Sequence, residues 1–112
     1  MSEFTFLFRN ASVFNQPPEQ MQAYSQKWMT WFKELGDNGY IKHPGAPLQP
    51  TGKVIKGKNR SIHDGPYVES KDIVNGYTLI EARDLSHAVE IASGCPLLEL
   101  GGAVEVRPVR IL

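Results

Sequence analysis

The feature that most constrains the fold is a row of phenylalanines spaced two residues apart near the start of the chain. Phe4, Phe6 and Phe8 share one side of this segment, and Leu7 and Arg9 share the other. A two-residue period is typical of a β-strand, in which successive side chains point to opposite faces. Residues 3–9 are therefore predicted to form a strand whose aromatic face lies under another element.

The next segment has the pattern expected of that covering element. Large apolar side chains recur at steps of three and four residues, as on one side of an α-helix: Met21, Tyr24, Trp28, Trp31, Phe32 and Leu35. Pro17 and Pro18 suit a helix start, and Gly36 and Gly39 suit its end. We interpret this stripe as core packing, which argues against a stacking platform for RNA.

The rest of the chain reads as short strands and one more helix. Glycines and prolines punctuate residues 40–60, where segments 47–49 and 53–56 are predicted edge strands or arms, and residues 60–63 the returning arm of a hairpin. Residues 76–83 and 103–112 alternate as strands do. Asp84 is the predicted N-cap of a second helix with an apolar stripe that ends at Cys95, and a loop is expected over 97–102.

This order of elements predicts an α+β fold in a single domain that spans residues 1–112. Strand, helix, hairpin, strand, helix and strand correspond to a ferredoxin-like β-α-β-β-α-β sandwich with an extra hairpin and both helices on one face of the sheet. Apolar side chains lie on both sides of the strands, as with Phe6 against Leu7 and Leu79 against Ile80. We therefore expect the second face to be buried in a homodimer.

Composition excludes several classes of partner. Lys and Arg number 12, as do Asp and Glu, so the chain has no net charge that would attract nucleic acid or an anionic membrane. No apolar run approaches the ~20 residues that cross a bilayer. Cys95 is the single cysteine, so an internal disulfide cannot form. A cytoplasmic protein that binds neither nucleic acid nor membrane is expected.

Several short motifs, in this order, resemble the YCII-related family and its branch with an Asp-Gly-Pro-Phe signature. They are Asp64-Gly65-Pro66-Tyr67, Asn75-Gly76-Tyr77-Thr78-Leu79-Ile80-Glu81, Asp84-Leu85-Ser86-His87-Ala88 and Gly102-Ala103-Val104-Glu105-Val106-Arg107-Pro108. Tyr67 stands where the signature has phenylalanine. The resemblance implies a dimeric α+β barrel, in which two ferredoxin-like sheets pack face to face, and it implies no known reaction.

The candidate catalytic residues are His63 and Asp64. An imidazole titrates near neutral pH and suits acid–base chemistry, and the following Asp-Gly-Pro is a strong turn signal. Adjacent residues of a strand point to opposite faces, so a direct pair requires the strand to end between them. Arg9, Tyr67 and Tyr77 are the candidate ligand-binding residues, and Arg9 would hold an anionic group.

Other chemistries lack support in the sequence. The histidines and the cysteine have no metal-ligand spacing, and Gly101-Gly102 precedes a strand, whereas a phosphate loop opens a helix, so we expect neither metal nor cofactor. His87 is expected to face solvent on the second helix. Arg107 has a structural alternative to ligand binding, which is pairing with Glu81 or Glu105.

Three functions remain open, and the residues leave undecided whether the protein is an enzyme. The first is the binding or transformation of a small anionic organic molecule in a cavity between two sheets. The second is a cofactor-independent monooxygenase or decarboxylase of the dimeric α+β barrel group. The third is a non-catalytic sensor or interaction module.

Overall fold

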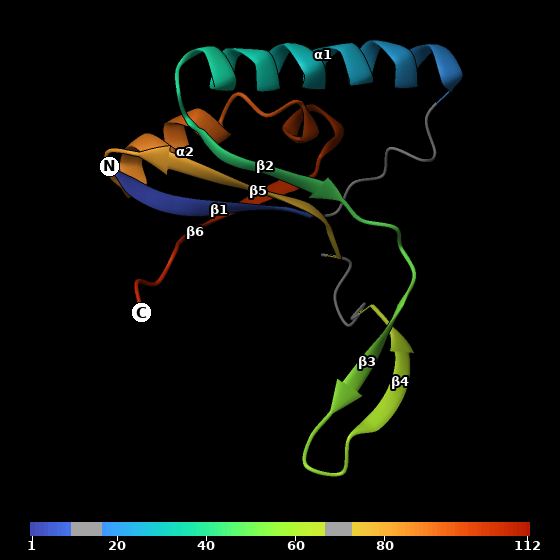
Figure 1. The fold of residues 1–112 in the computed structure, drawn as a ribbon. Coiled ribbons are helices and arrows are strands. Elements are labelled where there is room, and N and C mark those ends of the chain that lie inside the picture. The colour runs from blue at the N-terminus through green and yellow to red at the C-terminus, as the bar shows by residue number, and fades with distance from the viewer. Residues whose placement is uncertain (10–16, 67–72) are drawn as a thin grey trace.

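The computed structural model describes residues 1–9, 17–66 and 73–112, and these form two layers with a projecting hairpin (Figure 1). The elements are β1 (Ser2–Arg9), α1 (Pro18–Asp37), β2 (Ile41–Pro47), β3 (Gly52–Lys56), β4 (Ser61–Gly65), β5 (Val74–Ala82), α2 (Leu85–Ala92), the 3₁₀ helix η2 (Pro96–Leu100) and β6 (Ala103–Pro108). An antiparallel sheet has the order β2-β5-β1-β6, and β3 pairs with β4 separately. The predicted α+β, ferredoxin-like order with an extra hairpin is confirmed.

The core lies between the sheet and the helices. Phe4, Phe6 and Phe8 are buried on the face of β1 that α1 and α2 cover, as the alternation predicts. The ring of Phe6 stacks on Trp31 of α1, with centroids 6.3 Å apart. Leu35, one turn further along α1, is also buried. Burial of these aromatic surfaces is the main force that holds the layers together.

Both helices begin where the sequence predicts. α1 starts at Pro18, and Gly39 has a φ of 73° just after its last turn. Asp84 caps α2, because its carboxylate accepts a hydrogen bond from the backbone N–H of His87 at 2.8 Å. The expectation that His87 faces solvent is wrong. Its ring is buried against Tyr40, and Nδ1 accepts a hydrogen bond from the backbone N–H of Arg83 at 3.1 Å.

The first strand after α1 lies earlier than predicted. The sequence placed a short edge strand over 47–49, whereas β2 covers Ile41–Pro47. Two register irregularities interrupt its pairing with β5, one on each side of His43. Pro44 is tolerated because β2 is an edge strand. At an edge, the missing N–H of proline can face away from the sheet, so no hydrogen bond between strands is lost. Because Pro44 and Pro47 lie within β2, an interpretation that treats prolines as strand boundaries does not find this strand.

Glycine at position 45 lets β2 approach β5 closely. Its φ is +70°, and a Cβ atom there would lie 1.9 Å from the carbonyl oxygen of Tyr77. Any other residue would have to displace the backbone of one of the two strands. This close approach shapes the end of the sheet where the candidate site lies.

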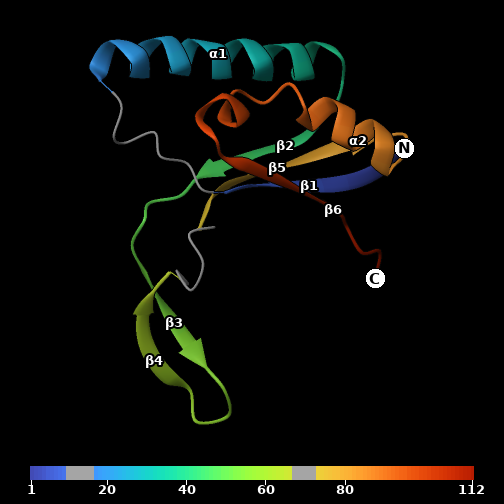
Figure 2. The same ribbon diagram turned by 180° about the vertical axis from the view of Figure 1, so that it is seen from behind.

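The hairpin β3–β4 is confirmed as an arm that leaves the body. Val54 pairs with His63 and Ile55 with Ile62 across it. Figures 1 and 2 show the arm projecting on the side of the sheet opposite α1 and α2. The two remaining differences are at the other end of the chain. Residues 96–100 form η2, which occupies most of the loop expected over 97–102, and β6 stops at Pro108, before the predicted end at 112.

Candidate functional site

A pocket of about 540 Å³ lies between α1 and the part of the sheet formed by β2 and β5. Its helical wall consists of side chains on one stripe of α1, with Phe8 and Leu97 behind it. Its other wall comes from residues 44–48 and 75–78. The lining residues on the helix are Met21, Tyr24, Ser25, Trp28 and Phe32.

The helical wall is aromatic because the stripe of α1 is wider than the core beneath it. Trp28 packs edge to face on Phe8, with ring centroids 5.0 Å apart, and lies against Phe32 at 5.6 Å. Trp28 and Phe32 are only partly buried, whereas Trp31 on the same stripe is buried. One side of each partly buried ring therefore packs against the core, and the pocket lies alongside it.

The sheet wall has small residues and backbone whose polar groups are largely paired. The Thr78 hydroxyl donates to the carbonyl of Pro44 at 3.0 Å, and the backbone N–H of Leu48 donates to the carbonyl of Asn75 at 2.8 Å. Gly76 lets β2 lie close against β5, because a Cβ there would lie 3.1 Å from the carbonyl oxygen of Ala46. The pocket is thus apolar, with hydroxyl and amide groups at Ser25, Tyr24 and Asn75.

The ionisable side chain on the helical wall of the described pocket is Tyr24. Tyr77 is also a lining residue, but it alternates with buried Thr78, so its ring is on the other face of the sheet. Burial raises the pKa of Tyr24 above its usual value of 10.0, and a hydrogen bond with Trp28 opposes this rise only in part. Tyr24 is therefore a neutral phenol at neutral pH. Among the described lining residues none carries a full charge, so the pocket favours uncharged parts of a ligand.

The residues predicted from the sequence do not gather at this pocket. Tyr77 lines it. His63 and Asp64 are exposed on the arm, where His63 Nε2 lies 3.1 Å from the hydroxyl of Ser61 and Asp64 pairs with Lys53. Arg9 lies on the other face of the sheet, and Tyr67 lies outside the described residues.

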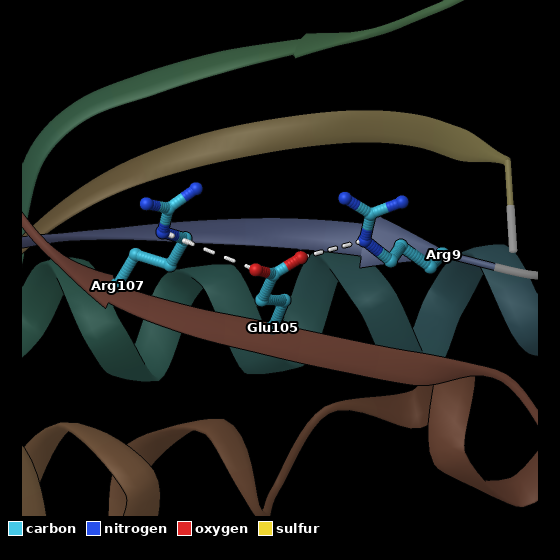
Figure 3. A network of polar contacts seen from close by, with 3 residues as sticks. All are labelled: Arg9, Glu105 and Arg107. Carbon is cyan, nitrogen blue, oxygen red and sulfur yellow. Dashed lines mark hydrogen bonds and ion pairs between the residues drawn. The ribbon is translucent and has the colours of Figure 1, made fainter. Parts of the chain in front are cut away.

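On that other face, Arg9 belongs to a charged network with β6 (Figure 3). Its Nε donates to Glu105 at 2.7 Å, and Nε of Arg107 lies 3.9 Å from the second oxygen of the same carboxylate. Of the two partners considered for Arg107, Glu105 is the one observed. Glu81 instead lies 3.7 Å from the ammonium group of Lys42.

Sequence reasoning missed Trp28, Phe32 and Tyr24 as site residues because it assigned the whole stripe to the core. The available signal was Ser25, a small polar residue on the same stripe at the spacing of Met21 and Trp28. A serine inside an aromatic stripe leaves unfilled space beside its neighbours. That space becomes a pocket where the opposite wall includes the small residues Gly45, Ala46 and Gly76.

Two further findings concern the described residues only. No group of three or more His, Cys, Asp or Glu among them is arranged to hold a metal ion. None of their helices is long and apolar enough to cross a membrane.

Cys95 is 2% exposed, and burial raises the pKa of its thiol to about 12, which makes it an inert core residue, as predicted.

Two helices on one face of a four-stranded antiparallel sheet define an α+β protein of the ferredoxin-like class. The chain belongs to the YCII-related domain family, whose model matches residues 7–111. No curated protein matches the sequence. A similar solved structure is 5-chloro-2-hydroxyhydroquinone dehydrochlorinase (TftG) from Burkholderia phenoliruptrix, in complex with 2,5-dihydroxybenzoquinone. It is 15% identical, with a TM-score of 0.50, and the match covers 96% of this chain and 93% of that one. At this identity the likeness concerns the fold.

Proposed function

We propose that this protein binds a small uncharged molecule with an aromatic or quinone-type ring in the pocket between α1 and the β2–β5 end of the sheet. The observation that carries the proposal is the aromatic wall of Tyr24, Trp28 and Phe32 beside a cavity of about 540 Å³. Ligand pockets have volumes of roughly 300–1,000 Å³ and apolar walls with a few polar groups. This pocket has both properties.

The shape and chemistry of the walls favour a flat ring. Aromatic side chains attract a second ring by stacking or edge-to-face contact, which adds to simple burial. The hydroxyls of Tyr24 and Ser25 are polar groups at the helical wall that suit the hydroxyl or carbonyl substituents of a phenol or quinone. The 2,5-dihydroxybenzoquinone in the TftG complex is of this class, and it guides the choice of the first compounds to test.

Binding is the step that the described residues support most directly. The acid–base side chain on the helical wall of the described pocket is Tyr24. Burial raises its pKa, so it is a neutral phenol that does not suit general base catalysis at neutral pH. A catalytic role for His63 and Asp64 stays a prediction, as does an anionic ligand at Arg9. Both concern regions away from this pocket.

The test is calorimetric titration with hydroquinone and, as a control of similar size without a π-system, cyclohexane-1,4-diol. Hydroquinone should bind saturably, and the diol should bind at least about tenfold more weakly. Equal affinity for the two compounds, or no binding of hydroquinone, would contradict the proposal.

A pair of variants locates the binding site. Ser25→Phe places a large ring at an exposed position of the pocket stripe and should reduce affinity by about tenfold or more. Gln22→Phe adds the same ring at an exposed position of α1 that does not line the pocket, and it should leave the affinity unchanged. Circular dichroism of both variants checks that α1 is intact.

We also propose that the protein is a homodimer joined through the face of the sheet opposite α1 and α2, which we call the open face. Its centre carries Thr5, Leu7, Tyr77 and Leu79, partly buried or exposed in the single chain. A contiguous apolar centre with charged residues around it is the usual composition of an interface.

Light scattering tests the dimer. The wild-type protein should have twice the 12.5 kDa mass of one chain at micromolar concentration. Leu79→Lys, which places a charge in the open face, should give the single-chain mass, and Met29→Lys on the exposed side of α1 should not. A wild-type protein with the mass of one chain would refute the homodimer.

A further inference from the structure

The arm, residues 52–65, lacks the packing that would make it stable in water as an isolated hairpin. Within the described part of the chain, β3 and β4 pair with each other and with no strand of the main sheet. An isolated two-stranded hairpin is at best marginally stable in water. The arm also exposes a matched apolar pair, since Ile55 lies opposite Ile62 and the two are 67% and 68% exposed.

α2 carries a second exposed apolar pair at the opposite end of the molecule. Leu85 and Val89 are one helical turn apart, hence on one face, and are 47% and 48% exposed. The first turn of α2 lies beside the start of β2, because the ring of His87 packs on Tyr40 with centroids 5.1 Å apart. The arm instead follows the far end of β2 (Figures 1 and 2).

The strand register decides how two open faces fit together. In the pairing of β1 with β5 and β6, Thr5 shares a row with Leu79 and Arg107, and Leu7 shares a row with Tyr77 and Glu105. These two rows lie on either side of the row of Phe6. A two-fold axis that runs across the strands at Phe6 exchanges the rows, because residue i of one copy then faces residue j of the other.

This exchange places opposite charges face to face. Arg107 faces the partner's Glu105, and Glu105 faces the partner's Arg107. Glu3 and Arg9 are equally far from Phe6 along β1, so Glu3 faces the partner's Arg9. A two-fold axis along the strands would instead place Glu81 against the partner's Glu3, since those two residues pair across the sheet centre. Lys42, which lies 3.6 Å from Glu3 and 3.7 Å from Glu81, offsets part of that repulsion but forms no new pair across the interface. Charge complementarity therefore favours the axis across the strands, which does form such pairs.

With that axis, the arm of one copy passes the end of the partner at which α2 begins. Packed sheets lie about 10 Å apart, whereas a five-residue strand spans about 17 Å. Ile55 lies about 10 Å beyond the start of β3, and the four residues 48–51 between β2 and β3 can add roughly 13 Å of extended chain. Together these lengths carry the isoleucines past the partner's sheet to its helical layer. Its charge fits as well, because one acid accompanies four basic residues, Lys53, Lys56, Lys58 and Arg60. Around α2, the acidic residues Glu81, Asp84 and Glu90 outnumber the basic Arg83.

We propose that each arm packs its Ile55–Ile62 pair on the Leu85–Val89 pair of the partner's α2. The inference rests on the proposed homodimer and adds a second contact to it, which occurs twice by symmetry. The arm is then a clasp whose exposed isoleucines are covered in the assembly.

Cysteine cross-linking tests the contact. The double variant Ile62→Cys/Leu85→Cys should form a disulfide-linked dimer on oxidation, seen on a non-reducing gel, because the arm and α2 of one chain lie at opposite ends. Ser61→Cys/Leu85→Cys, with its cysteine on the other face of the arm, should cross-link far less. Buried Cys95 serves as the unreactive background.

The single variants complete this test. Ile62→Cys alone should stay uncross-linked, and a linked dimer from it would show the two arms side by side, which overturns the axis across the strands. A protein that is dimeric by light scattering, but whose Ile62→Cys/Leu85→Cys variant forms no link, overturns the clasp and leaves the homodimer standing. A monomeric wild-type protein overturns both.

A charge-matched pair of variants measures the strength of the clasp. Ile55→Asp/Ile62→Asp should raise the dimer dissociation constant by about tenfold or more in sedimentation equilibrium. Asn59→Asp/Ser61→Asp adds the same charge away from the isoleucines and should change it by less than about threefold. Equal effects of the two double variants would mean that the isoleucine pair makes no specific contact.

Discussion

The two faces of strand β1 differ in how completely the rest of the chain buries their side chains. On one face Phe4, Phe6 and Phe8 are buried under the helices. On the other, Leu7 lies between Thr5 and Arg9 and stays partly exposed. Both faces are built from alternate residues of the same eight-residue strand. One face is therefore a finished core, and the other has the composition of a surface that is completed by association.

The arm resembles the exposed face of β1, because its apolar side chains are also left uncovered by the single chain. The covered face gains its stability from burial within the chain, whereas the arm and the open face have apolar groups that a single chain leaves exposed, such as Ile55 and Ile62. Substitutions on the covered face should thus act on folding at any protein concentration. Substitutions on the open face and the arm should act mainly on assembly, and so depend on concentration.

The largest expected effect compares neighbouring residues of β1. Phe6→Ala removes a fully buried ring that stacks on Trp31 and should lower the free energy of unfolding by about 3–5 kcal/mol. Leu7→Ala should lower it by about 1 kcal/mol or less in dilute protein, with a larger loss at high concentration. Urea denaturation at two protein concentrations checks both. A concentration-independent loss for Leu7→Ala would break the contrast between the faces.

The second prediction concerns the covered face at alkaline pH. Burial raises the pKa of Cys95 from 9.0 to about 12, so the unfolded chain loses this proton at lower pH than the folded protein does. Stability from this group is therefore complete below about pH 9 and is lost as pH rises towards 12. The loss is about 1.4 kcal/mol per pH unit in that range, and Tyr24, whose pKa is also raised, adds to it above about pH 10.

Urea denaturation of the wild type and of Cys95→Ala between about pH 8 and about pH 10.5 measures this loss. The variant, less stable at neutral pH, should show a shallower decline. An equal slope for both proteins would mean that the thiol ionises as readily in the fold as in the unfolded chain.

Most of the covered face could be predicted from the sequence because periodicity reports burial. The two-residue period of β1 and the stripe of α1 both arise from one buried side, and Asp84 is a cap that acts locally. β2 was misplaced because its tolerance of Pro44 depends on its position at the sheet edge. His87 was misjudged because its burial depends on Tyr40, which is distant in sequence.

The pocket was harder to predict because it results from what is missing between two elements. Trp28 has the helical spacing of a core residue, and nothing in its spacing shows that Gly45 and Gly76 face it across the layer. Conversely, the turn chemistry of His63 and Asp64 is a strong local signal, yet it places them on an exposed arm. Local patterns predict elements well, whereas cavities depend on pairs of elements.

A third, smaller effect is expected at the start of α2. Asp84→Ala removes the hydrogen bond from the carboxylate to the N–H of His87 and should lower the free energy of unfolding by about 1 kcal/mol. Ser86→Ala, an exposed position in the same turn, should change it by a few tenths at most. Thermal denaturation compares the two. If α2 supports the partner's arm, Asp84→Ala should also weaken the dimer. An unchanged dimer dissociation constant would mean that α2 contributes to folding only and not to the dimer contact.

The smallest effect is expected for the ion pair between Lys53 and Asp64 on the arm. Their side chains are 67% and 91% exposed, so solvent and salt screen the attraction, and a double-mutant cycle with alanine should give a coupling of about 0.5 kcal/mol or less in dilute protein. The same cycle at a concentration that favours the dimer distinguishes two states of the arm. A coupling that rises on assembly indicates that the pair becomes partly desolvated beside a partner, since lower local dielectric strengthens it. A coupling that stays constant would mean that the arm keeps the same solvent exposure in the dimer as in the single chain, and the contrast between arm and core would then hold in every state of the protein.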